Sequence, residues 1–286
     1  MDLQEFLVLW CGFFGTVALV GYARSLFGMT KAQRAVRVMG RIEQVREPKH
    51  GSSQRDGIPV AVSFQDPFTG QEFTVTNDAG HGEWITAAWT GRQVGVRYPR
   101  GRPHDYRFVS DLWANRYGRA WPNFAVFLLY VGLVVFAAID WGWPWALIGF
   151  GVPWTGSALW YLPQSTRAVG RRIDALASRP PVEGRVIAVL TDTSTDGEGS
   201  TFTTHTPVIA FTTHDGTVVT AYCTADLCNP KNSYGRTLTI HYTPDDPAVF
   251  TPDIAALHRS RPLDVIFNVV ALLLGVAAAV IGVLLL

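Results

Sequence analysis

The stretch Asp192–Thr203, which reads DTSTDGEGSTFT, begins in the way that a calcium-binding loop does. Asp192 and Asp196, with a serine between them and a glycine after them, have the spacing of the first ligands of an EF-hand. That loop requires a glutamate at its twelfth position and helices on both sides, whereas here the twelfth residue is Thr203 and the flanks alternate like strands. We therefore interpret the stretch as a polar hairpin connection, with Asp192 and Asp196 as weak metal candidates.

Cysteine and histidine side chains form a second set of candidate metal ligands. Cys223 and Cys228 have a short spacing that zinc sites use, but no second short-spaced pair accompanies them. Cys223 also ends a predicted strand, where a small buried side chain is expected. His241 is the remaining weak candidate, together with His205 and His214. We expect no metal and no cofactor, and in a reducing cytosol the two cysteines are expected to be free thiols.

Two short stretches, His81–Trp84 and His104-Asp105, pair a histidine with a carboxylate, as acid–base catalysis requires. Neither lies beside a nucleophile signature such as G-x-S-x-G, and no glycine-rich phosphate loop is present in the sequence. We expect both pairs to be solvated turns, and we expect the protein not to be an enzyme.

The elements that must position these residues include four long uncharged runs. About 20 apolar residues cross a bilayer as a helix, so each run is long enough to span a membrane. The first run follows MDLQE, which has two acids and no base, so it resembles a retained anchor more than a signal peptide. The runs contain no Lys, Arg, Glu or His, which argues against an ion pump. They are Phe6–Ala23, Ala120–Ile139, Trp141–Thr166 and Val265–Leu286.

The positions of Lys and Arg predict the orientation. Apart from Arg24, every basic residue lies in residues 28–121 or 163–262, which share one side if the chain crosses four times. The positive-inside rule makes that side cytoplasmic. We therefore expect a multi-pass protein of the plasma membrane, with both termini outside. The net charge of +1 offers no basic surface for nucleic acid.

Matching residues recur at a spacing of 144 and predict an internal duplication. The repeated anchors are glycines before or within strands, a tyrosine that ends a strand, and a proline in the following loop. The anchor pairs are Gly40 and Gly184, Gly91 and Gly235, Tyr98 and Tyr242, and Pro103 and Pro247. We interpret the chain as two parallel copies of one unit, helix–β-domain–helix.

Within each copy, β-branched and aromatic residues alternate between Gly, Asp and Pro turns, which predicts five short strands. The first set is expected near Val36–Val45, Ile58–Phe64, Glu72–Thr76, Val94–Tyr98 and Tyr106–Val109. The second set is expected near Val182–Leu190, Thr206–Phe211, Val218–Tyr222, Thr237–Tyr242 and Val249–Thr251. Asn77–Thr90 and Thr224–Tyr234 interrupt the strands, and each is expected to hold a helical turn. Alternation places Val94, Val96 and Tyr98 on one face and Leu238, Ile240 and Tyr242 on the matching face, and we expect both faces to form the interior.

The predicted fold class is therefore an α+β membrane protein with four transmembrane helices. Two small antiparallel five-stranded domains, each a closed or half-open barrel of the OB or SH3-like kind, lie in the cytoplasm. We place helices at residues 6–27, 120–140, 143–163 and 264–286, and β-domains at residues 35–112 and 180–253.

The strand and turn residues of the second copy resemble a bacterial family, domain-of-unknown-function family 3592. Its pattern has a G-R/K-V strand, a strand ending in phenylalanine, a D-G hairpin, and a G-x-x-V-x-V-x-Y-x-P-x-x-P ending. The corresponding residues are Gly184-Arg185-Val186, Pro207–Phe211, Asp215-Gly216 and Gly235–Pro247. The first copy matches more loosely. The resemblance implies two copies of the domain and a shared fold, and it transfers no catalytic residue.

We expect a non-enzymatic scaffold or regulator whose cytoplasmic β-domains bind a protein partner, in contact with the lipid bilayer and capable of homo-oligomerisation. One alternative is a subunit of a passive transporter or channel, which would require polar faces on the helices. A second alternative is a membrane-tethered hydrolase or small-molecule-binding protein.

Overall fold

The computed structural model describes residues 3–77, 83–110, 112, 119–197, 199–224, 227 and 229–286. The chain forms two compact units. A helical unit comprises Met1–Arg34, Trp113–Arg171 and His258–Leu286, and a β unit comprises Ala35–Leu112 and Arg172–Leu257. Both sheets thus belong to one unit, although the sequence predicts two separate β-domains.

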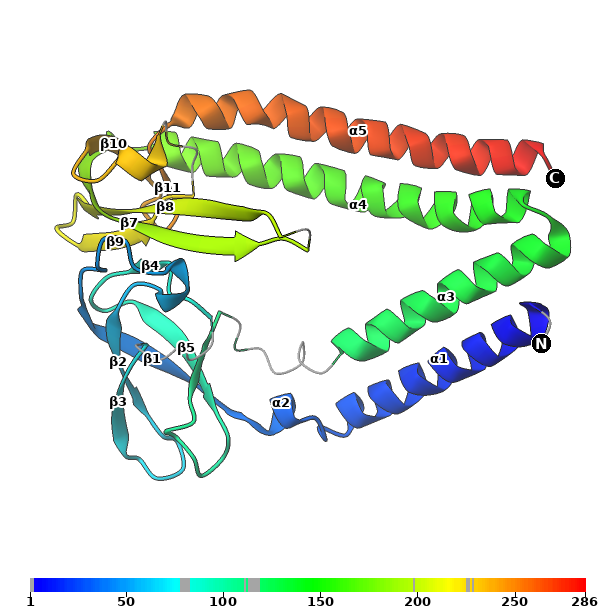
Figure 1. The fold of residues 1–286 in the computed structure, drawn as a ribbon, viewed down its shortest axis with the longest axis horizontal. Coiled ribbons are helices and arrows are strands. Elements are labelled where there is room, and N and C mark those ends of the chain that lie inside the picture. Colours follow the sequence, from blue (N-terminus) through cyan, green and yellow to red (C-terminus); the bar gives the residue numbers. More distant parts are fainter. Residues whose placement is uncertain are drawn as a thin grey trace. The chain divides into compact units, whose positions relative to one another are not determined.

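Among the described residues, four long α-helices and one short one are accompanied by two 3₁₀ helices, Gln54–Asp56 and Pro230–Asn232 (Figure 1). The α-helices are α1 (Leu3–Leu26), α2 (Lys31–Arg34), α3 (Ala120–Trp141), α4 (Pro144–Ala177) and α5 (Ile254–Leu284). Three segments of the described chain are long and apolar enough to span a membrane: α1, α3 and the Val265–Leu284 part of α5. The fourth predicted span lies within α4, whose first half is helical but rich in tryptophan, glycine and proline. Those residues lower its mean hydropathy. The fourth predicted span is therefore not among the described helices that are long and apolar enough to cross a membrane.

Helices α1 and α3 pack antiparallel through a small residue. A Cβ on Gly132 of α3 would lie 2.8 Å from Trp10 Cδ1 of α1, so only glycine allows this approach. The indole nitrogen of Trp10 donates a hydrogen bond to the carbonyl of Leu128 over 3.1 Å. At the far end, Gln4 donates to Asp140 over 2.7 Å.

Helices α4 and α5 make the corresponding contacts. A Cβ on Gly275 of α5 would lie 2.8 Å from Trp154 Cδ1 of α4, and the Trp154 indole donates to the carbonyl of Ala271 over 2.9 Å. Trp10 and Trp154 are 144 residues apart in the sequence. Each helix pair is therefore held by one tryptophan that packs on a glycine and hydrogen bonds to the neighbouring backbone.

The first sheet has the strand order β3-β2-β1-β5-β6. Its antiparallel strands are β1 (Val36–Val45), β2 (Val60–Gln65), β3 (Glu72–Thr76), β5 (Gln93–Tyr98) and β6 (Arg107–Val109). The sheet curls so far that the Tyr106 hydroxyl, next to β6, donates to the carbonyl of Thr76 in β3. Strands β3 and β6 nevertheless remain the two ends of the sheet, so of the predicted closed or half-open barrel it is the half-open form.

The second sheet has the strand order β11-β10-β7-β8-β9-β4 (Figure 1). Its strands are β7 (Val182–Thr195), β8 (Thr201–Thr212), β9 (Val218–Tyr222), β10 (Thr237–Tyr242), β11 (Phe250–Thr251) and β4 (Ala87–Ala88). The prediction of five strands is therefore wrong for this sheet, because β4 comes from the first half of the chain. Strands β7 and β8 also extend several residues beyond their predicted ends.

The two sheets share a local irregularity at the same place. The pairing of β1 with β2 shifts register between Ile42 and Gln44, and the pairing of β7 with β8 shifts between Val186 and Ala188. Such a bulge bends the strand and increases its twist. In each case the residue just before the neighbouring strand accepts a hydrogen bond at the bulge: Ile42 N donates to Arg92 O at 2.8 Å, and Val186 N donates to Arg236 O at 2.9 Å.

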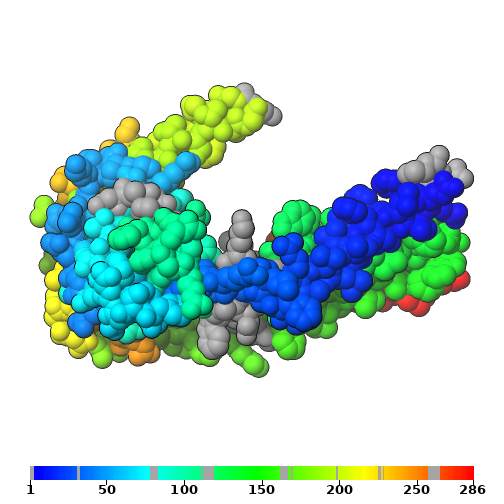
Figure 2. Space-filling model, turned by 90° about the horizontal axis from the view of Figure 1, so that it is seen from below, coloured from blue at the N-terminus to red at the C-terminus, as the bar shows by residue number. Residues whose placement is uncertain are grey.

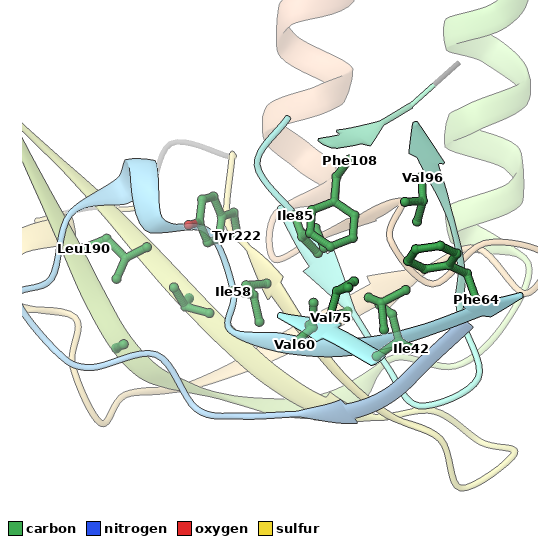
Figure 3. Packing of buried hydrophobic residues seen from close by; sticks show 14 of the residues in the cluster. Ile42, Ile58, Val60, Phe64, Val75, Ile85, Val96, Phe108, Leu190 and Tyr222 are labelled. Atoms are coloured by element: carbon green, nitrogen blue, oxygen red, sulfur yellow. The ribbon is translucent and has the colours of Figure 1, made fainter. Parts of the chain in front are cut away.

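One hydrophobic core joins the sheets. It contains Ile42, Ile58, Val60 and Val96 of the first half and also Ala188, Leu190, Val208 and Tyr222 of the second half (Figure 3). A second core lies on the other face of the second sheet and includes Val186, Ile209, Ile240 and Tyr242. Of the predicted interior residues, Val96, Tyr98, Ile240 and Tyr242 are buried. Val94 and Leu238, near the starts of their strands, are half-buried against the same cores.

Candidate functional site

Strand β4 fixes the first half of the chain to the second sheet. Ala87 pairs with Ala221 and Ala88 pairs with Thr220, and Tyr222 N donates to the carbonyl of Thr86 over 2.7 Å. Ala87 lies in one core and Ala88 in the other, so both faces of β4 are covered. Side chains larger than alanine would not fit without displacing one of the two cores.

Arg92 holds this strand in place. Its guanidinium lies 4.8 Å from the ring centroid of Trp89 and donates a hydrogen bond to the carbonyl of Ala87. Burial lowers the pKa of Arg92, and the charge of Asp246 partly opposes that change. Arg92 therefore joins β4 to the turn before β5, and its charge interacts with Asp246 of the second half of the chain.

The loop from His50 to Asp56 covers the edge of β7. Val189 N donates to His50 Nδ1 at 3.1 Å, and Thr191 N donates to the carbonyl of Ser52 at 2.9 Å. The hydroxyl of Tyr222 donates to the carbonyl of Gln54 at 3.1 Å. The first half therefore contributes one edge strand of the second sheet, β4, and a loop that hydrogen bonds to the part of β7 beyond its pairing with β10.

Beyond this loop, β7 and β8 continue as a two-stranded arm, which we define as residues Asp192–Thr204. Figure 2 shows the arm, in yellow-green, projecting from the remainder of the β unit. Strand pairing continues from Asp192 with Thr204 to Thr195 with Thr201. The arm is rich in threonine, whose β-branched side chain favours extended backbone. Phe202 on the arm is 55% exposed.

The two acidic candidates, Asp192 and Asp196, make contacts at the base and at the turn of the arm. Asp192 forms an ion pair with Arg55, with 3.3 Å between Oδ2 and Nε. Asp196 closes the turn, because its side chain accepts from Ser200 N at 2.9 Å and its own N donates to the carbonyl of Ser200 at 2.9 Å. The prediction of a polar connection between strands differs from the structure in one respect: most of Asp192–Thr203 is itself strand.

The cysteine and histidine candidates lie apart in the described chain. Cys223 is buried with 5% exposure, and Cys228 lies outside the described residues. His241 is a half-buried residue of β10 opposite Thr251, and His205 contacts Thr191 at 3.4 Å. His214 Nε2 lies 3.0 Å from the carbonyl of Pro180. Within the described ranges, no three His, Cys, Asp or Glu side chains gather in a group that could hold a metal ion.

The described side chains of the two histidine–carboxylate stretches contact other residues. His81 lies outside the described residues, and Glu83 accepts a hydrogen bond from Ser110 N at 2.7 Å. His104 packs edge-on against Phe73, and Asp105 forms an ion pair with Arg102 at 3.2 Å. Each of these described groups is engaged by a different neighbour, as in an ordinary surface turn.

The glycine anchors occupy matching backbone positions. Gly91 has φ of 90° and Gly235 has φ of 77°, which is a conformation that favours glycine. Gly91 N donates to the carbonyl of Ile42 at 2.8 Å, and Gly235 N donates to the carbonyl of Val186 at 2.9 Å. Gly40 and Gly184 lie in central strands, and a Cβ on either would lie 2.6 Å from a neighbouring aliphatic side chain.

The tyrosine anchors each reach a hairpin turn. The Tyr98 hydroxyl donates to Asp66 at 2.9 Å, in the turn between β2 and β3. The Tyr242 hydroxyl accepts from His214 N at 2.9 Å, in the turn between β8 and β9. Pro103 and Pro247 lie in the loops that follow β5 and β10, and both are half-buried.

Sequence reasoning missed β4, the covering loop and the arm. For β4 a signal exists, since Ile85, Ala87 and Trp89 are apolar at alternate positions. The prediction of a helical turn in Asn77–Thr90 is wrong for the described part of that stretch, which contains β4 instead. The expected turn in Thr224–Tyr234 is confirmed by a 3₁₀ helix at Pro230–Asn232.

Comparison with protein families matches residues 182–255 to a domain of unknown function, DUF3592. These residues contain β7 to β11, so the expected resemblance is confirmed over this stretch. No curated protein and no solved structure matches the chain. Over the five strands that its second half contributes, the chain is therefore similar to a family whose function is unknown.

Proposed function

We propose that this chain is a multi-pass membrane protein, made of two helix–β-sheet–helix copies, whose β unit binds a protein partner in the cytoplasm. The arm of the β7–β8 hairpin is the observation that carries the proposal. It is the part of the β unit that extends beyond the shared core, and it presents Phe202 to solvent.

The membrane part of the proposal adds a fourth span to the three apolar helices. Residues 144–161 of α4 are uncharged and helical, and they pack on α5 through Gly151, whose Cβ would lie 2.8 Å from Ala279 N. A helix that packs against an apolar span shares its environment. Four crossings with the basic residues in residues 28–121 and 163–262 place the β unit in the cytoplasm by the positive-inside rule.

The duplication is supported by contacts that recur at a spacing of about 144 residues. They include the tryptophan–glycine contacts of the helices, the register shifts near Ile42 and Val186, and the tyrosine that reaches a hairpin turn. Common descent of the two copies explains why these irregular features coincide, because packing alone would not place bulges at equivalent positions.

The partner-binding role follows from the physics of the arm. A two-stranded ribbon without a covering layer is marginally stable in water, and exposed strand edges pair readily with other chains. The threonines along both strands keep the backbone extended, so that its outer edges can pair with another strand. Phe202, near the tip, offers one exposed apolar side chain to a partner. A partner that adds a strand or covers Phe202 would stabilise the arm by main-chain hydrogen bonds and apolar burial.

Site-specific photo-crosslinking in cells tests the proposal. A photoreactive phenylalanine analogue at Phe202 should give one discrete protein adduct, which mass spectrometry then identifies. The control is the same analogue at Val218, which is 61% exposed on β9 of the same sheet. Equal labelling at both positions, or no adduct at Phe202 in membranes that contain the protein, would refute a binding role for the arm.

A hairpin-shortened variant gives an independent test. Replacing Thr193–Thr203 by Asn-Gly joins Asp192 to Thr204, which are paired residues, through a two-residue turn of the favoured type. This variant should fold and reach the membrane but should lose the adduct partner in co-purification. Retention of the partner by the shortened protein would contradict the proposal.

A further inference from the structure

A groove lies between α1 and α3 at the end where α1 finishes and α3 starts. Its volume is about 370 Å³, and it is lined mainly by apolar side chains. That volume is within the range of about 300–1,000 Å³ that is usual for small-molecule sites. The lining residues are Thr16, Val17, Val20, Gly21, Arg24, Trp121 and Pro122.

The shape of the groove is set by a close contact. A Cβ on Gly21 would lie 2.6 Å from Pro122 Cγ, so the two helices touch at this point. Next to it, the Tyr22 hydroxyl donates to Asn123 Oδ1 over 2.6 Å and joins the same two helices. The proline ring is rigid and glycine has no side chain, so neither residue can move to close the groove. The groove beside this helix–helix contact is therefore present before any ligand binds.

The chemistry of the groove changes along its length. Val17 and Val20 offer hydrocarbon toward the middle of α1, whereas Arg24 lies in the last turn and supplies a guanidinium group. Trp121 is 70% exposed at the first turn of α3, where an aromatic ring suits the membrane interface. Arg119, the residue before α3, is exposed at the same end of the helix pair.

We propose that this groove binds one anionic phospholipid. An acyl chain lies along Val17, Val20 and Pro122, and the phosphate is held by Arg24, with Trp121 at the level of the headgroup. Basic positions between transmembrane helices on the cytoplasmic side are suited to acidic headgroups. The proposal rests on the membrane location proposed above and is independent of the protein partner.

A lipid fits this groove better than a helix of a second copy does. A second helix packed on the groove would cover Arg24 and leave its charge without a counter-ion, which is costly in an apolar environment. The guanidinium can instead form paired hydrogen bonds with a phosphate, while the apolar remainder of the groove takes a flexible chain. Charge complementarity therefore favours an anionic lipid.

Native mass spectrometry of the full chain in a mild uncharged detergent tests the proposal. Phosphatidylglycerol and phosphatidylcholine with identical acyl chains are titrated separately, and the fraction carrying one lipid is measured. We expect about fivefold tighter binding of phosphatidylglycerol, the factor for about 1 kcal/mol per basic residue near anionic headgroups. Arg24→Gln should abolish that difference.

Two further variants separate charge from shape. Arg167→Gln removes an exposed arginine outside the groove and should leave the lipid preference unchanged. Val20→Trp fills the groove and should weaken binding of both lipids. Equal affinity for the two lipids in the unaltered protein, or equal effects of Arg24→Gln and Arg167→Gln, would overturn the proposal.

A failure of the membrane location itself would look different from a failure of lipid binding. In that case an alkaline wash would release the protein from membranes without detergent. A protein that stays in the membrane but shows no lipid preference would refute the groove alone.

Discussion

Truncating Leu190 to alanine should destabilise both sheets, although Leu190 belongs to the second one. Its side chain is fully buried in the core that also contains Ile42, Ile58 and Val60 of the first half. If the halves folded independently, a change in β7 would leave the strands of the first sheet unaffected. The shared core predicts the opposite outcome.

The size of the effect follows from the burial of Leu190. Leucine to alanine removes three carbon atoms, and each buried methylene contributes about 0.8 kcal/mol. The cavity left behind adds to this loss, so the free energy of unfolding should fall by about 2–5 kcal/mol. A loss of about 3 kcal/mol corresponds to a roughly hundredfold increase in any process that requires the unit to open.

Hydrogen–deuterium exchange of the full chain in detergent, read by mass spectrometry, measures that opening segment by segment. In Leu190→Ala, amides of β1 and β2 should exchange roughly a hundredfold faster, as should those of β7 and β8. Ile240→Ala is the matched control, because Ile240 is equally buried but lies in the core on the other face of the second sheet. It should cost a similar free energy and affect β7 and β10 more than β1 and β2.

Unchanged protection of β1 and β2 in Leu190→Ala, together with faster exchange in β7 and β8, would refute a shared core. It would mean that the halves are two separate domains, as the sequence predicts.

Three further predictions follow from the charges and side-chain contacts. Reporter fusions after Arg55 and after Gly197 should be cytoplasmic and a fusion at Leu286 external; an external signal from either of the first two would contradict the positive-inside argument. Burial opposes ionisation of Asp66, but hydrogen bonds from a tyrosine hydroxyl, a threonine hydroxyl and two backbone amides outweigh it and lower its pKa. Its stabilising contribution is therefore present above the unfolded-state value of about 3.9 and lost as the pH falls through the lower folded value, so Asp66→Asn should flatten the acid limb of a plot of melting temperature against pH. Millimolar calcium should not raise the melting temperature of the full chain, because Asp196 closes a turn; a rise that Asp196→Ala abolishes would reveal an ion site.

Local patterns were sufficient for most of the secondary structure. Strands β1, β3, β9 and β10 have the predicted bounds, since alternating β-branched residues between glycine and proline turns favour a strand whatever surrounds them. The apolar runs likewise predicted the long helices. The spacing of 144 residues pointed to the equivalence of Tyr98 and Tyr242, and each of these side chains reaches a hairpin turn.

The polar composition of the arm predicts a loop, whereas most of it forms strand. Serine, threonine, aspartate and glycine between two apolar strands are typical of a connection. Thr193 and Thr203 instead continue the ladder, since pairing with the opposite strand satisfies their backbone groups and their β-branched side chains favour extended backbone. The sequence predicted the hairpin but could not tell how far the ladder extends.

Residues close together in the chain were enough to predict the long helices, most of the strands and the glycines that their turns require, because these features depend on local conformation and apolar periodicity. Tertiary structure alone decided that Ala87–Ala88 joins the second sheet and that Leu190 is buried against the first. Both outcomes depend on surfaces contributed by residues about 100 or more positions away. Apolar side chains are buried wherever the folded chain removes them from water, and no local pattern specifies which distant surface does so.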